Sequence, residues 1–254
     1  MSAKYTVTGI VLSWMPVSES DKRVVLLTFE KGRITAFARG ARKATSPLLA
    51  CTEIFAYGEF EIYETRNSRT IQNAKIENFF KNVREDFSSV YYGMYFCELL
   101  DGLTVENVSA EEEVKLLYLA LKSLTVEEIG RKLVKNVFEL RLMKIIGEMP
   151  KLYECSICKG KEAIDYFSAA DEGVVCKHCV SKAATHGSLR KMSSSTLYAL
   201  QYIVFVDVKK LFSFSLSEEC RKELEGIMSD YLKLHLEKTP KSLSMIEEVE
   251  RLNQ

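Results

Sequence analysis

Over the first 80 residues, apolar and polar positions alternate in short runs that turn residues separate. A period of two predicts strands with one buried face. Such runs cover residues 5–12, 23–29, 33–38, 51–57, 59–65 and 70–76. The Glu30-Lys31-Gly32 turn predicts a hairpin between the second and third runs. About five short strands with regular turns predict a small barrel or sandwich, and an OB-like barrel fits the length.

From about residue 84 the apolar positions recur every three or four residues, which predicts helices. Ser109-Ala-Glu-Glu and Thr125-Val-Glu-Glu resemble capping-box starts, and Gly147 with Pro150 ends the second of these helices. Further helices are expected over residues 197–205 and 217–235, with a short helix or frayed tail over 242–254. The chain is therefore expected to be α+β, with a barrel followed by helices.

Four cysteines form two pairs, Cys155-Ser-Ile-Cys158 and Cys176-Lys-His-Cys179, with 17 residues between them. This spacing is typical of a structural zinc site, because each pair brings two thiolates to one side of a tight loop. Four cysteine ligands leave no position for water, so such a site stabilises a fold and does not catalyse. Two disulfides or four free thiols are the alternatives.

The other cysteines, Cys51, Cys97 and Cys220, stand alone and are expected to be small buried apolar residues in a reducing cytosol. The N-terminus has no signal-peptide pattern, and no run of 18 apolar residues is present. We therefore expect a cytoplasmic protein that does not cross a membrane.

Lys+Arg and Asp+Glu both number 35, so net charge alone indicates no partner. Their distribution is uneven: residues 1–81 hold 12 basic against 8 acidic side chains, and residues 82–150 hold 8 against 12. The predicted barrel is thus the basic part of the chain.

Within the barrel, basic residues gather around Phe37; the cluster comprises Arg33, Arg39, Arg42 and Lys43, with Lys22-Arg23, Arg66 and Arg69 on neighbouring turns. Basic side chains can follow a phosphate backbone, and aromatic faces can stack on unpaired bases. The cluster is therefore a candidate DNA-binding surface. The alternative is an ordinary solvated face with Phe37 in the core.

A second basic segment lies on the predicted helix over residues 125–146. Arg131, Lys135 and Phe138 are three or four residues apart and so share one face, with Lys132 one step around it. A basic rim beside an apolar groove could receive an acidic, apolar peptide. The alternative is a core helix with a solvated edge.

Signs of catalysis are few. The chain has no phosphate-binding glycine loop, and His178, His186 and His235 lie in no nucleophile or base motif. We therefore expect a protein that is not an enzyme.

Nearly the whole chain resembles the RecO family of DNA repair proteins. The segments that carry the resemblance are Gly9-Ile-Val-Leu12, Ser20-Asp21-Lys22, Leu26-Leu27-Thr28, Gly32, Ala38-Arg39-Gly40-Ala41-Arg42-Lys43, Phe138-Glu139-Leu140-Arg141-Leu142, Gly147, Pro150, Cys155, Phe167-Ser168, Gly173-Val-Val-Cys176 and Lys241-Ser242-Leu243. Their order and spacing are more specific than any one of them. The basic Lys177-His178 between the last two zinc ligands departs from the family's pattern.

The resemblance implies an OB-fold over residues 1–81, a helical domain over 82–150 and 183–254, and a zinc module over 151–182. It implies a recombination mediator, associated with the nucleoid, that binds and anneals single-stranded DNA. Such proteins act with RecR, contact the C-terminal tail of the single-stranded-DNA-binding protein and help to load RecA. A protein-interaction adaptor without nucleic-acid binding is the alternative function.

Overall fold

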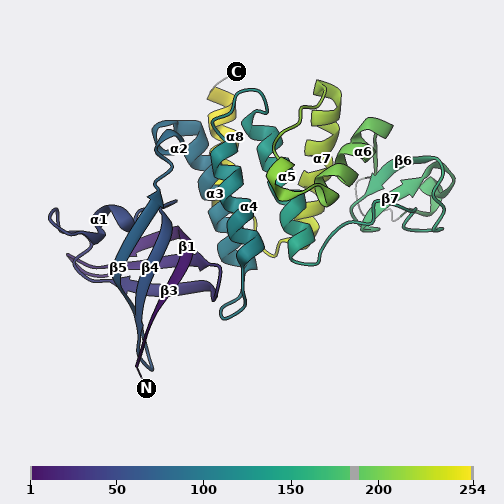
Figure 1. The fold of residues 1–254 in the computed structure, drawn as a ribbon. Coiled ribbons are helices and arrows are strands. Elements are labelled where there is room, and N and C mark those ends of the chain that lie inside the picture. The colour runs from purple at the N-terminus through teal and green to yellow at the C-terminus, as the bar shows by residue number, and fades with distance from the viewer. Residues whose placement is uncertain (1, 184–188, 253–254) are drawn as a thin grey trace. The chain divides into compact units, whose positions relative to one another are not determined.

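The computed structural model describes residues 2–183 and 189–252 of the chain (Figure 1). They form two compact units. The first comprises Met1–Thr125 and Pro240–Gln254, and the second comprises Val126–Thr239. In the described part of the chain, no helix is both long and apolar enough to span a membrane.

The first unit begins with a closed five-stranded barrel of strand order β1-β2-β3-β5-β4 (Figure 1). Its strands are β1 (Ala3–Pro16), β2 (Lys22–Thr28), β3 (Gly32–Ala38), β4 (Tyr57–Glu64) and β5 (Arg69–Asn78). Thr28 pairs with Gly32 across an antiparallel hairpin, so the predicted β2–β3 turn is confirmed. Apolar side chains at alternate positions fill the interior, among them Leu26, Ile34 and Phe60. The OB-fold that the strand pattern indicated is thus present.

The strand expected over residues 51–57 is wrong. Helix α1 (Leu48–Cys51) occupies the start of this segment, and residues 52–56 form a turn. The Thr52 hydroxyl donates to the Leu48 carbonyl at 2.7 Å. Phe55 has a φ of 71°, in the left-handed region that bulky residues rarely adopt, yet its side chain is fully buried. Burial of this ring therefore outweighs the strand preference of the apolar run.

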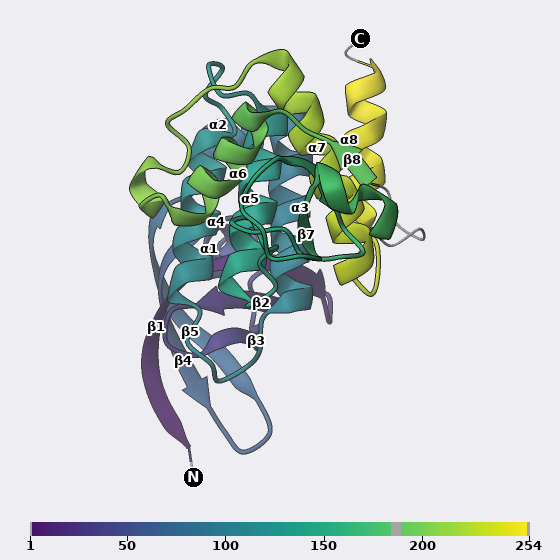
Figure 2. The same ribbon diagram turned by 90° about the vertical axis from the view of Figure 1, so that its right-hand side faces the viewer.

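Four helices complete the first unit: α2 (Lys81–Glu85), α3 (Phe87–Leu103), α4 (Glu111–Ser123) and α8 (Lys241–Leu252). Figure 2 shows α8 beside α3, and the two helices pack against each other. The Glu98 carboxylate on α3 accepts hydrogen bonds from the backbone N–H groups of Lys241 (2.8 Å) and Ser242 (3.0 Å). A terminal helix was one of the two forms expected after residue 242, and the structure has it.

Both predicted capping boxes in the middle of the chain are wrong. The Ser109 hydroxyl donates to the Phe29 carbonyl at 2.8 Å, and α4 begins at Glu111 without a side-chain cap. Helix α5 (Arg131–Ile145) begins six residues after Thr125, directly behind Gly130, which has a φ of 76°. In both places tertiary contacts or a glycine turn set the helix start.

The second unit contains helices α5, α6 (Ser194–Phe205) and α7 (Glu218–His235) with the 3₁₀ segment η2 (Val208–Lys210). It also carries a three-stranded sheet of order β7-β6-β8, formed by β6 (Ile164–Ser168), β7 (Gly173–Cys176) and β8 (Leu189–Lys191), and the 3₁₀ segment η1 (Lys177–Lys182).

The helices expected over residues 197–205 and 217–235 are present as α6 and α7, and α6 begins three residues earlier than expected. Gly147, with a φ of 88°, ends the helical segment as expected. The Ser193 and Ser217 side chains accept hydrogen bonds from Thr196 and Cys220 N–H groups, so each caps the helix that follows it.

Candidate metal centre and nucleic-acid surface

The four paired cysteines meet at one point of the second unit. Cys155 and Cys158 lie on the loop before β6, Cys176 ends β7, and Cys179 lies in η1. Their sulfur atoms are all within 4.8 Å of one another, and the Cys158 and Cys176 Sγ atoms are 3.7 Å apart. A tetrahedral ion with metal–sulfur distances of about 2.3 Å sets its sulfurs about 3.8 Å apart. The cluster therefore has the size that a metal ion requires.

Backbone N–H groups point at these sulfurs: those of Cys176 and Gly160 lie 3.4 Å from the Cys155 and Cys158 Sγ atoms. Burial acts to raise the pKa of Cys155, but N–H groups of the two loops lower it to about 6. Burial and the neighbouring sulfurs raise the pKa of Cys179 to about 12, because thiolates repel one another unless a cation lies between them. No disulfide joins any of the four. The donor set thus fits a metal ion that four sulfurs enclose.

Among the described histidines, His178 and His235 lie outside the cluster. His178 is exposed and lies outside the group of four sulfurs. His235 ends α7, where its Nδ1 lies 2.9 Å from the Tyr231 carbonyl oxygen. His186 falls outside the described residues. Of the lone cysteines, Cys97 and Cys220 are buried as expected, whereas Cys51 is partly exposed.

The turn around Gly40 presents three cations of the barrel to solvent. Arg39, Arg42 and Lys43 are all exposed, and Gly40 adopts a φ of 67° between them. The Gly40 N–H donates to the Asp21 carboxylate at 2.8 Å, and this hydrogen bond is the main cause of the lowered pKa of Asp21. The turn is thereby held against the β1–β2 loop, so the three cations share one end of the barrel.

Not every basic candidate lies on this surface. Lys22 was expected there, but its side chain is buried. Its side chain is 1 % exposed, and its Nζ donates to Glu53 at 2.6 Å and to Thr52 at 3.2 Å. Lys22 is therefore an internal cation. Its carboxylate partner lies 31 residues later in the sequence. Arg33 remains partly exposed, but it forms an ion pair with Asp101 at 3.2 Å.

Two aromatic side chains lie on the outer face of the barrel. Phe37 is 36 % exposed, which contradicts the alternative that it belongs to the core. Tyr63, on β4, is 39 % exposed. No sequence motif singles out Tyr63, although it lies at an outward position of a predicted alternating strand.

The candidate partner surface on α5 is not an open groove. Phe138 is completely buried, so the alternative of a core helix is the one that the structure supports. Lys135 forms an ion pair with the buried Glu139 at 2.8 Å and is itself largely covered. Further along α5, Arg141 and Lys144 donate to carbonyl oxygens at the end of α6 and so act as a C-terminal cap. The third candidate, Arg131, is partly exposed at the start of α5.

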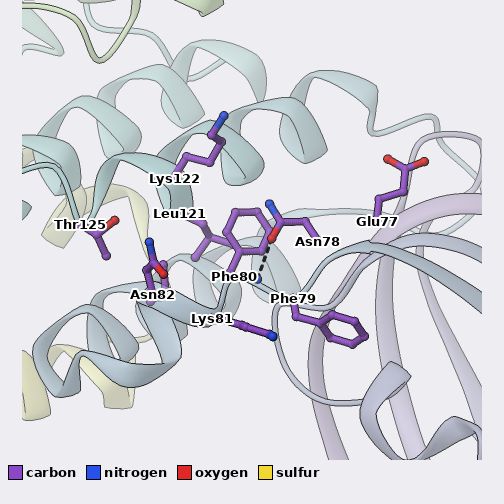
Figure 3. Close-up of a pocket in the computed structure, with 10 residues that line it drawn as sticks. Glu77, Asn78, Phe79, Phe80, Lys81, Asn82, Leu121, Lys122 and Thr125 are labelled. Atoms are coloured by element: carbon purple, nitrogen blue, oxygen red, sulfur yellow. Dashed lines mark hydrogen bonds between the residues drawn. The ribbon is translucent and has the colours of Figure 1, made fainter.

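A pocket of about 430 Å³ lies beside α2 in the first unit, with Lys81 and Lys122 among its lining residues (Figure 3). The Phe80 ring packs between Leu121 and Asn78, and the Asn78 side chain accepts the Phe80 N–H at 2.8 Å. Phe80 and Leu121 are both buried. The Phe80 ring therefore offers no open face to a base in this pocket, whereas Phe79, which also lines it, is half-buried.

Comparison with known proteins covers both parts of the chain. The family model described as "Recombination protein O N terminal" matches residues 1–80, and "Recombination protein O C terminal" matches residues 84–244. A DNA repair protein RecO of Acetivibrio thermocellus is 30 % identical over 247 residues, which span 96 % of this chain and 97 % of the relative. The RecO protein of Bacillus subtilis strain 168 is 30 % identical over 223 residues, 88 % of this chain and 86 % of the relative.

Both family models follow the chain in the order of its barrel and its helical part, and the full-length relatives agree with them. The chain therefore belongs to the RecO family of DNA repair and recombination proteins.

Proposed function

We propose that this chain is a recombination mediator that binds single-stranded DNA on its OB barrel and anneals complementary strands. The observation that carries the proposal is the Gly40 turn, where Arg39, Arg42 and Lys43 are exposed together on one barrel end. Three neighbouring cations neutralise consecutive phosphates without reading sequence, as an annealing protein requires. Membership of a family of DNA repair proteins also supports a role in binding DNA.

The four-cysteine cluster is proposed to hold one structural zinc ion. Sulfur-only ligands favour zinc, and four of them leave no open position at which water could be activated. Cys155, Cys158, Cys176 and Cys179 would thus fix the loops around β6 and β7 relative to one another. The proposed role of the whole chain is accordingly that of a binding protein and not an enzyme.

A recombination mediator works with other proteins of DNA repair. We propose that the chain acts with RecR, contacts the single-stranded-DNA-binding protein and so assists RecA at the nucleoid. The α5 surface is not retained for the tail of the single-stranded-DNA-binding protein, because Phe138 is buried and Lys135 is paired with Glu139. The single-stranded-DNA-binding protein remains a proposed partner, but its contact is not assigned to α5.

A salt titration tests the function. Binding of a fluorescent single-stranded oligonucleotide is measured between 50 and 200 mM salt (roughly the range in which phosphate contacts dominate), with and without RecR. Log K should fall linearly with log salt, and the protein should accelerate annealing of complementary oligonucleotides. Absence of any oligonucleotide binding, alone or with RecR, would favour the alternative of an adaptor that binds proteins only.

A further inference from the structure

The outer face of the barrel carries a row of side chains that the strand register aligns. On β3, Phe37 pairs with Arg23 of β2 on one side and with Thr70 of β5 on the other. On β4, Tyr63 pairs with the same Thr70. Arg23, Phe37, Thr70 and Tyr63 therefore follow one another across four adjacent strands.

Alternation shows that this row faces outward. The residues beside Phe37, namely Ala36 and Ala38, are fully buried, whereas Phe37 is exposed. The same holds on β4, where Ile62 is buried and Tyr63 is exposed. Successive side chains of a strand point to opposite faces, so both rings project from the outer surface.

The two rings lie close enough together to act on one ligand. Because β5 alone separates their strands, their Cα atoms are roughly 10 Å apart. That distance corresponds to about three stacked nucleotides at ~3.4 Å each. No aromatic contact pairs either ring with another ring in the described part of the chain. Both rings are partly exposed, so each can offer a face to a flat apolar ligand.

A hollow of about 320 Å³ lies beside Phe37, and its lining includes Thr35 and the β4–β5 turn. Arg66, on this turn, is exposed. Arg69 at the rim is not available, because it forms ion pairs with Glu64 at 2.7 Å and Glu106 at 2.6 Å. The hollow therefore combines one open aromatic wall with one open cation.

We infer that Phe37 and Tyr63 form a stacking platform for unpaired bases, with Arg23 and Arg66 at its edges to neutralise the intervening phosphates. The inference rests on the proposed function and assigns it a ligand class, because paired bases cannot present their faces to these rings. Stacking is tolerant of sequence, since every base has a π face. The platform thus separates single-stranded from duplex DNA without reading bases.

The test uses the full chain with Phe37→Ala, Tyr63→Ala and the double substitution. Removal of each ring should weaken binding of a single-stranded oligonucleotide about tenfold, while the salt slope stays that of wild type. The ring-preserving changes Phe37→Tyr and Tyr63→Phe should keep wild-type affinity. Phe87→Ala removes an aromatic side chain that is 66 % exposed on α3 and is the matched control.

An oligonucleotide of abasic sites separates base contacts from phosphate contacts. Wild type and the double variant should bind it equally, and both should bind it less tightly than wild type binds normal single strands. If wild type binds single strands and the double variant binds them equally well, the platform is refuted and the proposed function stands. If wild type binds no single strand, both are refuted. Unchanged thermal unfolding of the variants shows that the fold is intact.

Discussion

The hydroxyl group of Ser242 donates a hydrogen bond to the Glu98 carboxylate at 2.6 Å, although 144 residues separate the two in sequence. The Ser242 N–H donates to the same oxygen at 3.0 Å, and the Lys241 N–H donates to the other oxygen at 2.8 Å. One carboxylate on α3 therefore caps the first turn of α8. The contact fixes a distant segment of the chain to the first unit.

Replacing Glu98 by Gln should loosen α8. An amide accepts through one oxygen only and carries no charge opposite the helix dipole, so we expect a loss of about 1–2 kcal/mol. Hydrogen exchange in α8 should rise selectively, while the barrel strands remain protected. Glu85→Gln, an exposed carboxylate at the end of α2, is the control. Equal exchange in α8 of both variants would show that the cap contributes nothing.

The same contact should depend on pH. Partial burial acts to raise the pKa of Glu98, but hydrogen bonds from Ser242 and Lys241 outweigh it and hold the pKa below its usual range. A carboxyl whose pKa is lower in the folded state stabilises that state above its unfolded value, about 4.3. This stability is lost as the pH falls from there through the folded pKa. Hydrogen exchange in α8 should therefore rise in that acidic window, and Glu98→Gln should remove this component.

Protein purified without chelators should contain about one zinc per chain by elemental analysis. Cys176→Ser should lose the ion and raise hydrogen exchange over residues 151–182, because sites of this type rarely keep their shape without metal. Cys220→Ser changes a buried cysteine outside the cluster and should retain the zinc. Far less than one zinc in the wild-type protein would contradict the assignment.

Combined Arg39→Ala, Arg42→Ala and Lys43→Ala substitutions should weaken binding to all single strands alike. Each phosphate of a single strand that is no longer neutralised flattens the slope of log K against log salt by ~0.7, so the slope of the triple variant should be shallower by about 2 units. A control variant with exposed Lys209 and Lys210 changed to Ala removes two positive charges outside the barrel and should keep the wild-type slope. A triple variant with the wild-type slope would move the phosphate path away from the Gly40 turn.

Lys22→Met should change stability and not DNA binding. The variant keeps the apolar stem but leaves the Glu53 carboxylate and the Thr52 hydroxyl without the Nζ donor. We expect a loss of about 1–3 kcal/mol, measured by denaturant unfolding. Oligonucleotide affinity of the folded variant should equal that of wild type. Weaker binding with unchanged stability would instead place Lys22 on the DNA surface.

Features set by local chemistry could be predicted from the sequence. The Gly40 turn is one, because glycine supplies the positive φ of 67° that this turn requires at no steric cost. The start of α7 is another, since the Ser217 side chain caps a helix from within its own segment. The cysteine cluster follows from the two short spacings, each of which closes its own loop.

Features set by distant contacts could not be predicted. Lys22 has the sequence of a surface cation, and only the fold brings Glu53 to it. Phe138 has basic neighbours along α5, yet the packing of the second unit covers it completely. The turn at Phe55 illustrates the same limit, because an apolar run gives no sign of the left-handed conformation that buries its ring. In each case the residues that bury or pair the side chain lie far from it in the sequence.

The return of the chain to α3 through α8 has a consequence for synthesis. Residues 126–239 separate α4 from α8, so a ribosome must translate the entire second unit before Ile246 and Val249 can be buried in the first unit. At 5–20 residues per second, this takes roughly 6–23 s. During that interval the barrel and helices α2–α4 have been synthesised, but the α3 surface that α8 covers stays exposed.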